Sequence, residues 1–532
     1  MQSITVAIND LFEFEGQAIP GTKPESALLE AMVRRQFSFL PQPLEVRVGD
    51  DNVTVSFGEE SSAAQQEAVR LAGRAGKRAA NGEYQKAIGI LKRALELQPT
   101  LHAARRDLAM AYAACGDFDN AKNHLIEILR LDAKDHWSWV TLANLYAKNF
   151  DDFDTAEKFL QRALALSPDD PWALNSLGAV LLERGQPENA ARVFERAISA
   201  NPQVANPYYG LALTYCKSNQ PQLASETLNN LFVNGKPQDA RSTQVFATAR
   251  SLFVDLQTSL AEQHHAAALQ SVEELRAKME QLSGYPVRVS YENFQEEVGA
   301  SIQMAWKHNK DHHLIRCRKS WPERLMPHLV AHELDHLRLE SNARRSGKNR
   351  FLVSSARGRE VAIRSMEDEI LRWQKRGRSE SSITDAVLTS IQCACTHLLN
   401  CPIDMVIETA LGASMPALSH AQFLSVRLFA LEAWQSDSSA ERRELLPRSI
   451  LRSTLALNGA YALFLDDLFR GATAYAANYS KEETFATSEK LFRHWQSRFP
   501  QLGSGDEYGI VDDFASMLGL KDWYEWKLDP GP

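Results

Sequence analysis

Cysteine is scarce in this sequence, which has 6 cysteines among 532 residues. That density is far below the density of small disulfide-stabilised domains, so we expect reduced thiols. Long apolar runs are also missing, because no stretch reaches the roughly 18 residues that a membrane-spanning helix needs. Residues 1–15 show neither the basic start nor the apolar segment of a secretory signal. Together these absences predict an unexported, cytoplasmic protein.

An excess of positive charge is lacking as well. The chain has 59 Lys and Arg against 67 Asp and Glu, a formal net charge of −8. Such a chain has no general attraction to phosphate backbones or anionic lipids, so we expect neither a nucleic acid nor a membrane as partner. The 44% of hydrophobic and 24% of charged residues are typical of folded globular proteins. The length exceeds what one core usually supports and predicts several domains.

The first 60 residues predict a small α+β domain. Apolar residues alternate at Ile4, Val6 and Ile8, and two further alternating runs flank the turn residues of 49–52. A helical pattern covers 24–39. The domain is expected to serve either as a folded cap on the next part of the chain or as a partner-binding adapter.

A period of 34 residues follows over 61–236 and predicts about five stacked units. The fourth unit shows the pattern best, with apolar, small or helix-ending residues at Leu174, Leu177, Gly178, Leu181, Gly185, Ala190, Phe194, Ala197 and Pro202. This pattern resembles the tetratricopeptide repeat (TPR) family. The resemblance implies paired helices that stack into an α-solenoid, with a concave groove that binds a peptide or a partner protein. A helical linker is expected over 237–283.

The second half contains the motif His332, Glu333, Leu334, Asp335, His336. Two histidines four residues apart on a helix lie on one face, so both imidazoles can bind one Zn²⁺ ion. Glu333 is then placed to take a proton from a metal-bound water as general base. Ser320 and Glu323 have the spacing of a capping box, and Pro327 predicts either a kink or a late start of this helix. Asp335 is expected to be exposed and not catalytic.

Alternating residues at 287–291, 302–306 and 314–317 predict a small sheet before this helix. Sheet and motif together make the region 284–412 resemble the gluzincin metallopeptidases. The resemblance implies a zincin-like catalytic region in which a later helix donates a glutamate as the third zinc ligand. Residues 413–532 are expected to form a helical C-terminal lobe that completes the peptidase.

The third ligand is expected in the apolar segment 400–411, where Pro402 can open a helix. This segment carries two carboxylates four residues apart, Asp404 and Glu408. Carboxylates in such an apolar segment call for pairing or a bound metal. We assign Glu408 as the ligand and Asp404 as an acceptor that orients a ligand histidine. The gluzincin pattern places the ligand glutamate before the aspartate, so the two roles could be exchanged in this chain.

Two other sets of residues have weaker grounds for a role. Cys393, Cys395, His397 and Cys401 lack the spacing of a usual zinc site, and we interpret the cysteines as packed core residues. Tyr461 and Tyr475 are both candidates for stabilising a tetrahedral oxyanion, and spacing does not choose between them.

The sequence therefore predicts a mainly α protein with a smaller α+β part. Its predicted function is that of a zinc endopeptidase that hydrolyses peptide bonds of a protein partner bound through the repeats. Two alternatives remain open. One is a TPR scaffold with a catalytically inactive, peptidase-like second half. The other is a zinc hydrolase of small amides or esters.

Overall fold

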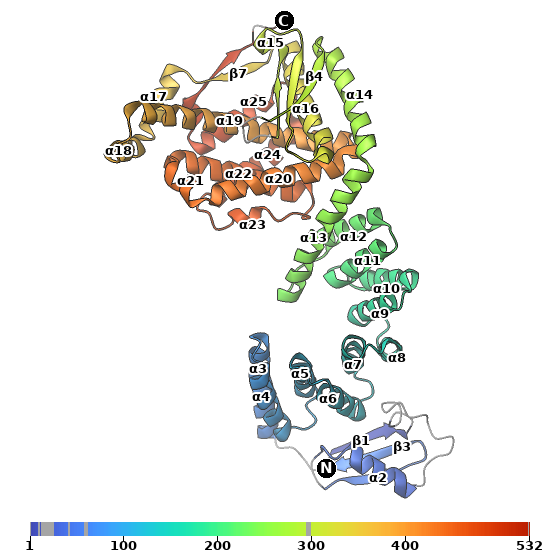
Figure 1. Ribbon diagram of the computed structural model, residues 1–532. Helices are drawn as coiled ribbons and strands as arrows, with labels where there is room; N and C mark the ends of the chain where they lie inside the picture. The colour runs from blue at the N-terminus through green and yellow to red at the C-terminus, as the bar shows by residue number, and fades with distance from the viewer. Residues whose placement is uncertain are drawn as a thin grey trace. The chain divides into compact units, whose positions relative to one another are not determined.

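The computed structural model describes residues 2–8, 11, 26–40, 43–57, 62–293, 299–529 and 531, which form two compact units. The first unit holds Met1–Gln220 and Asn234–Ser242. The second holds Pro221–Val233 and Thr243–Pro532. Helices dominate both units, as expected (Figure 1).

The first unit begins with the predicted small α+β domain. Strands β1 (Gln2–Ala7), β2 (Glu45–Val48) and β3 (Asn52–Phe57) form an antiparallel sheet in the order β1-β3-β2. Helix α2 (Ser26–Gln36) packs on this sheet through Leu29 and Val33. The predicted helical pattern begins at residue 24, and residues 24 and 25 lie outside the described residues.

This domain packs directly on the neighbouring repeats. Leu131 of the second repeat belongs to the core of the domain. The guanidinium of Arg105 lies 4.7 Å from the ring centroid of Phe39, and Arg130 donates a hydrogen bond to the carbonyl oxygen of Gln36. These contacts favour the first of the two predicted roles, a folded cap.

The predicted repeats form consecutive helix pairs, and a turn with positive φ joins the two helices of each pair. The turn residues are Gly82, Gly116, Asp151, Gly185 and Asn219, at intervals of 34 or 35 residues. Ten helices make up the five pairs: α3 (Ser62–Ala80), α4 (Tyr84–Leu97), α5 (His102–Ala114), α6 (Phe118–Leu131), α7 (His136–Asn149), α8 (Phe153–Leu166), α9 (Pro171–Glu183), α10 (Pro187–Ala200), α11 (Ala205–Lys217) and α12 (Pro221–Asn234).

Small residues let these helices approach one another. A Cβ atom added to Gly178 would lie 2.7 Å from the ring of Phe194, and one added to Gly210 would lie 2.5 Å from the same ring. Phe194 on α10 therefore fits between α9 and α11 only because both positions are glycine. Gly178, a small residue of the predicted repeat pattern, has this packing role.

The expected linker is instead two helices, α13 (Ala240–Gln263) and α14 (His265–Ser283). Ala268, Val272 and Met279 of α14 lie in the main core of the second unit, so α14 is part of that unit. Helix α12 also belongs there, because Phe232 packs edge-on against Phe253 of α13 and Ser225 accepts a hydrogen bond from Gln257.

The predicted sheet of the second unit has three strands in the order β4-β6-β5. Strand β4 (Val287–Glu292) is parallel to β6 (His313–Arg318), and β5 (Ala300–Gln303) is antiparallel to it. The predicted alternation continued to Trp306, but β5 ends at Gln303 and Trp306 lies in the short helix α15 (Ala305–His308). Beside the sheet lie α14 and α16 (Met326–Arg345) (Figure 1).

One hydrophobic core joins the sheet, α16 and the later helices, so 284–412 and 413–532 are parts of one body. The final strand, β8 (Glu525–Leu528), pairs antiparallel with β7 (Arg350–Val353), which comes after α16. The remaining elements are η1 (Glu323–Leu325), α17 (Ala356–Arg364), α18 (Glu367–Lys375), α19 (Glu380–Ser414), η2 (Pro416–Leu418), α20 (Ser419–Ser438), α21 (Ala440–Leu445), α22 (Arg448–Leu468), α23 (Ala476–Tyr479), α24 (Phe485–Arg498), η3 (Phe499–Gln501), α25 (Glu507–Leu518) and η4 (Lys521–Trp523).

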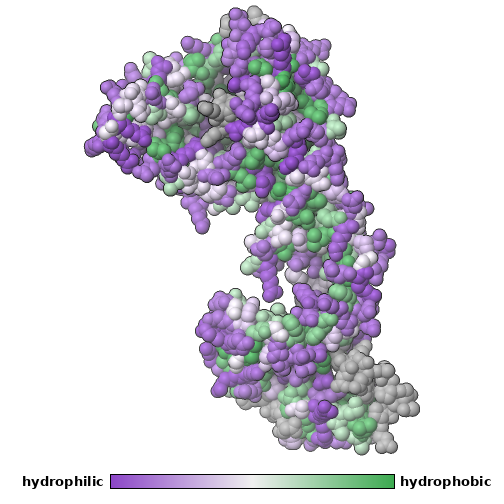
Figure 2. Space-filling view, viewed as in Figure 1, coloured by the Kyte–Doolittle hydropathy of each residue, from purple (hydrophilic) through white to green (hydrophobic). Residues whose placement is uncertain are grey.

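Helix α19 alone among the described helices is long and apolar enough to cross a membrane by length and composition. Half of its most apolar window is buried, and its side chains Ile391, Leu398 and Met405 lie in the core of the second unit. These contacts are those of a core helix. On the face seen in Figure 2, hydrophilic residues predominate, with hydrophobic patches between them.

Candidate functional site

Helix α16 carries the predicted motif and begins at Met326, with Pro327 in its first turn. Proline suits this position because the first backbone N–H groups of a helix have no partner inside it. Of the two predicted effects of Pro327, the late start is the one observed. No side chain caps the helix, so the predicted capping box at Ser320 and Glu323 does not form.

Three histidines line one face of α16 at intervals of four residues. The ring centroids of His332 and His336 lie 4.9 Å apart, and those of His328 and His332 lie 6.1 Å apart. His328 is almost fully buried, whereas His332 and His336 are partly exposed. One face of the helix therefore presents a row of imidazoles that runs from the core towards the solvent.

Helix α19 faces this row with two carboxylates. We predicted a separate helix that opens at Pro402, but the proline lies inside a single helix of 35 residues. A proline inside a helix removes the hydrogen bond to the carbonyl four residues earlier, here that of Leu398. Asp404 and Glu408 follow it one turn apart, and both point towards α16.

Asp404 lies against the two motif histidines. Its Oδ1 atom is 3.3 Å from Nε2 of His336 and 3.6 Å from Nε2 of His332. This oxygen is buried and has no hydrogen-bond partner among the described residues. Ligand atoms about 2.0–2.2 Å from a tetrahedral zinc ion lie about 3.3–3.6 Å from one another. The two Asp404–imidazole distances fall in this range, and the possible ligand atoms of His332, His336 and Asp404 all lie within 4.8 Å of one another.

Glu408 lies on the other side of His332. Its Oε1 is 2.8 Å from Nδ1 of His332, and its Oε2 is 3.0 Å from Nε2 of His328. Gln422 of α20 donates hydrogen bonds of 2.8 Å to Oε2 and to the backbone oxygen of Glu408. These are hydrogen-bond distances, shorter than the separation of two zinc ligands. The same three side chains, His328, His332 and Glu408, also meet the looser geometry of a possible cation site.

Glu333 belongs to α16 and is buried where this helix packs against the edge strand β5. Burial raises the pKa of its carboxyl group, while the neighbouring His336 and His332 and a hydrogen bond from the backbone of Ile302 oppose that rise. A carboxylate with a raised pKa holds a proton more firmly than an ordinary glutamate, which is what a general base requires.

The two carboxylates opposite the histidines behave differently from Glu333. Burial alone would raise the pKa of Asp404 and of Glu408, but the adjacent imidazoles outweigh it. The pKa of Asp404 is lowered by His332 and His336, and that of Glu408 by His328 and His332. Both groups are therefore anionic at neutral pH, as metal ligands or imidazole acceptors must be.

Asp335, which we expected to be exposed, is buried. Both of its carboxylate oxygens accept hydrogen bonds from Arg338, at 2.6 and 2.8 Å. The prediction failed because it placed Asp335 on a solvent-facing side of the helix, whereas α16 is covered on several sides by the sheet, α14, α19 and α20. The residue pairs with its own helix and does not approach the histidine row.

All the predicted site residues thus lie in one place, but they form two sets that share His332. His336 groups with Asp404, and Glu408 groups with His328. Sequence reasoning missed His328 and Gln422. The spacing of His328, four residues before His332, was a usable signal. Gln422 gave none, because only the packing of α20 brings it to Glu408.

Of the two candidate tyrosines, Tyr461 lies near the site. Burial first, and then the charges of Glu408 and Asp404, raise the pKa of its phenol. The pKa of Tyr475 is raised chiefly by burial, and its charged neighbours are Arg427 and Asp466. The interpretation of the α19 cysteines as core residues is right for Cys395 and Cys401, which are buried, and wrong for Cys393, which is exposed.

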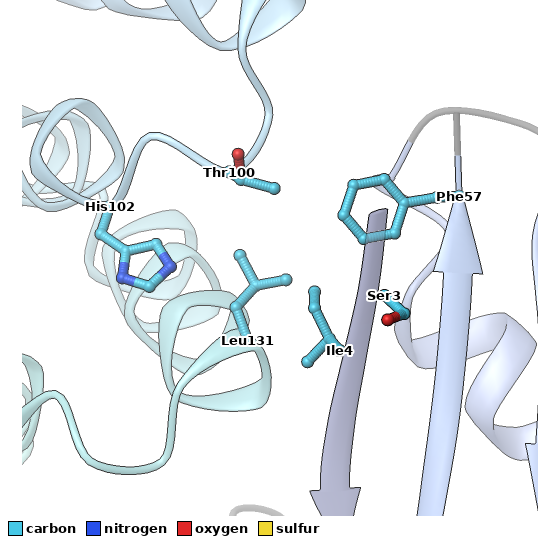
Figure 3. A pocket seen from close by; sticks show the side chains of 6 residues that line it. All are labelled: Ser3, Ile4, Phe57, Thr100, His102 and Leu131. Atoms are coloured by element: carbon cyan, nitrogen blue, oxygen red, sulfur yellow. The ribbon is translucent and has the colours of Figure 1, made fainter. Parts of the chain in front are cut away.

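A separate pocket of about 340 Å³ lies in the first unit. The small domain contributes Ser3, Ile4 and Phe57, and the repeats contribute Thr100, His102 and Leu131. The residues that line it include the apolar Ile4, Phe57 and Leu131 and the imidazole of His102 (Figure 3). It holds one titratable side chain, and so it lacks the constellation that hydrolysis requires.

Comparison with known proteins supports the repeats. Two tetratricopeptide repeat family models match the chain, one at residues 78–139 and 181–241 and the other at 135–203. No curated protein matches it.

Three of the similar solved structures are MamA, Pseudomonas aeruginosa pilF, and YrrB, described as a TPR protein with an unusual peptide-binding site. MamA is 24% identical, covers 29% of this chain and 91% of its own, and has a TM-score of 0.26. For pilF the values are 18%, 38%, 94% and 0.31, and for YrrB they are 21%, 34%, 91% and 0.25. Residues 78–241 of this chain consist of tetratricopeptide repeats.

Proposed function

We propose that the chain is a zinc-dependent endopeptidase whose tetratricopeptide repeats recognise a protein substrate or its carrier. The observation that carries the proposal is the set His332, His336 and Asp404, in which one buried carboxylate oxygen lies 3.3 and 3.6 Å from the Nε2 atoms of the two imidazoles. A zinc ion held there would polarise a carbonyl group and lower the pKa of a bound water. The proposed ligand set exchanges the roles that we predicted for Asp404 and Glu408.

Glu333 is the proposed general base. It follows a ligand histidine directly in sequence, and its burial favours the uptake of a proton. It would accept the proton of the attacking water and deliver it to the leaving amine as the peptide bond breaks. Tyr461 is the proposed donor to the developing oxyanion, since its phenol stays protonated beside the two carboxylates.

The neighbouring sheet edge suits an extended substrate. Strand β5 pairs with β6 on one side, and among the described residues no strand pairs with its other side. The backbone of Ile302 in β5 contacts Glu333, so a peptide added along this edge would pass the proposed base. We propose that β5 binds the substrate backbone, while the repeats supply recognition.

A second candidate is a scaffold without catalysis, because both matching family models lie within residues 78–241. Tetratricopeptide repeat proteins bind peptide or protein partners, so this function needs no chemistry in the second unit. On either proposal we expect the chain to act in the cytoplasm, where its thiols would stay reduced.

One experiment separates the two functions. Cell extract is incubated with the wild type or with Glu333→Gln, and new protein N-termini are identified by amine labelling and mass spectrometry. The peptidase predicts one zinc ion per chain in both proteins, and new N-termini only with the wild type. Equal N-termini in the two samples, in the presence of bound zinc, would sink the peptidase and favour the scaffold.

A further inference from the structure

A buried hydrogen-bonded cluster lies behind the proposed zinc ligands. It consists of His328 on α16, Glu408 on α19 and Gln422 on α20, each of which is at most 3% exposed. Three separate helices therefore contribute to it. Burying an ionised carboxylate is costly unless its oxygens are hydrogen-bonded, and here both oxygens are.

The partners of Glu408 assign its role. Oε2 accepts hydrogen bonds from Nε2 of His328 and from the amide of Gln422, so it is held from two sides. Oε1 is left for Nδ1 of His332 at 2.8 Å. A hydrogen bond from Nδ1 to a carboxylate fixes the proton on that nitrogen and leaves Nε2 free to bind a metal. In His332, the Nε2 atom faces Asp404.

We propose that His328 and Gln422 are positioning residues that act on the zinc ion through Glu408 and His332. This inference rests on the proposed zinc centre and adds to it the two residues that hold Glu408 in place. His328 and Gln422 lock the rotamer of Glu408, and Glu408 locks the tautomer and the ring orientation of His332. The third histidine of α16 is therefore not a ligand.

The geometry separates this role from direct ligation. A cation among His328, His332 and Glu408 would have to replace two hydrogen bonds of 2.8 and 3.0 Å, and Gln422 would still donate to one of its ligands. That position is also more deeply buried than the one beside His336 and Asp404. The existing hydrogen bonds and the deeper burial both favour protons, and not a metal ion, between Glu408 and the two histidines.

The test compares zinc affinity and the cobalt spectrum of six full-length proteins. They are the wild type, His328→Leu, His328→Gln, Gln422→Leu, Asp404→Ala and the matched control His313→Leu. His313 is likewise a fully buried histidine of the second unit, but it hydrogen-bonds to the backbone of Ala305. Zinc affinity is measured by competition with a chromogenic chelator, on protein shown to be folded by circular dichroism.

We expect each of the two positioning variants to bind zinc about 10–100-fold more weakly than the wild type. Both should also show a changed visible spectrum of bound Co²⁺, because the orientation of His332 is relaxed. His328→Gln, which keeps a donor towards Glu408, should recover most of the affinity. The control should lose stability but keep the zinc affinity and the cobalt spectrum of the wild type.

Three results would overturn the inference. Unchanged zinc affinity in both folded variants would make the cluster merely structural. Complete loss of zinc in His328→Leu, with retention in Asp404→Ala, would make His328 a ligand. A wild type that binds no zinc would remove the proposed function, and this inference with it. If one of the two positioning variants fails to fold, the other still tests the inference, because His328 and Gln422 lie on different helices.

Discussion

The ligand histidines and the proposed base were predictable from the sequence because their relative positions follow from one helix. Residues four apart on a helix share a face whatever surrounds it. The choice between Asp404 and Glu408 was not predictable in this way. Both lie on one face of α19, and which of them meets the two Nε2 atoms depends on how α19 is rotated and shifted against α16. The third imidazole of α16, that of His328, is a further partner that competes with His332 and His336 for a carboxylate of α19.

Asp404 and Glu408 should differ in their effect on metal content. Asp404→Ala removes a proposed ligand, so we expect zinc to be lost on dialysis. Glu408→Gln removes only the charge that orients His332, so we expect one zinc ion per chain with an affinity about 10–100-fold lower. Elemental analysis and chelator competition measure both. The opposite order, with zinc lost in Glu408→Gln and kept in Asp404→Ala, would restore the assignment predicted from the sequence.

The buried His313 should make stability sensitive to acid. Burial, reinforced by the charges of His312 and Arg344, lowers the pKa of His313 from 6.5 to about 4. Its Nδ1 accepts a hydrogen bond of 2.9 Å from the backbone N–H of Ala305, which requires the neutral ring. The stabilisation is therefore complete above pH 6.5 and is lost as the pH falls towards 4.

Chemical denaturation at pH 7.5, 6.0 and 5.0 checks this expectation. The asparagine side chain of His313→Asn cannot be protonated in this range. As the pH is lowered, the free energy of unfolding of this variant should therefore fall less steeply than that of the wild type. The variant should also be less stable at pH 7.5, because the smaller side chain leaves a gap beside Trp306, whose ring centroid lies 4.8 Å from that of His313. Equal slopes in the two proteins would rule out His313 as the group responsible.

At the scale of elements, the repeats were the most predictable part because their signal is repeated five times. Each pair carries the same small and apolar positions, and a slip of one residue at Asp151 does not disturb its neighbours. The helix boundaries around the site were harder to predict. Pro402 indicated the start of a helix, but the packing of α19 against α16 and α22 carries the helix through the proline.

Two glycines in similar helices should respond in opposite ways to alanine. In Gly178→Ala the new methyl group would lie 2.7 Å from the ring of Phe194, which Gly210 prevents from moving away, so we expect a loss of about 1–3 kcal/mol. Gly89 lies in α4 with no atom within 4 Å of an added Cβ. Gly89→Ala should gain about 0.5–1 kcal/mol from helix propensity alone.

Thermal and chemical unfolding of the two alanine variants beside the wild type measures the difference. The pair controls for the intrinsic preference of alanine over glycine, which has the same sign at both positions. If Gly178→Ala were as stabilising as Gly89→Ala, the close approach of α9, α10 and α11 around Phe194 would be wrong.

At the scale of the whole molecule, the boundary between the two units does not follow the repeat pattern. The sequence assigns α12 to the fifth repeat, but its residues Pro221–Val233 belong to the second unit. The periodicity shows only that the sequences of α11 and α12 resemble those of the earlier helix pairs. It contains no information on the surface of α13, where Phe253 lies between Phe232 and Phe423 in two edge-to-face contacts.

The second unit should therefore fold on its own only when α12 is included. A fragment of residues 221–532 keeps the packing of Phe232 on Phe253 and the buried hydrogen bond from Gln257 to Ser225. A fragment of residues 243–532 exposes Phe253 and leaves the Gln257 amide without that acceptor. Losing one buried aromatic contact and one buried hydrogen bond costs several kcal/mol, so we expect a midpoint of thermal unfolding lower by at least about 5 °C. Both fragments retain α16 and α19, so zinc content measured beside the melting curves reports on the site separately from stability. Equal midpoints would assign α12 to the repeats, and the whole array could then be removed without cost to the second unit.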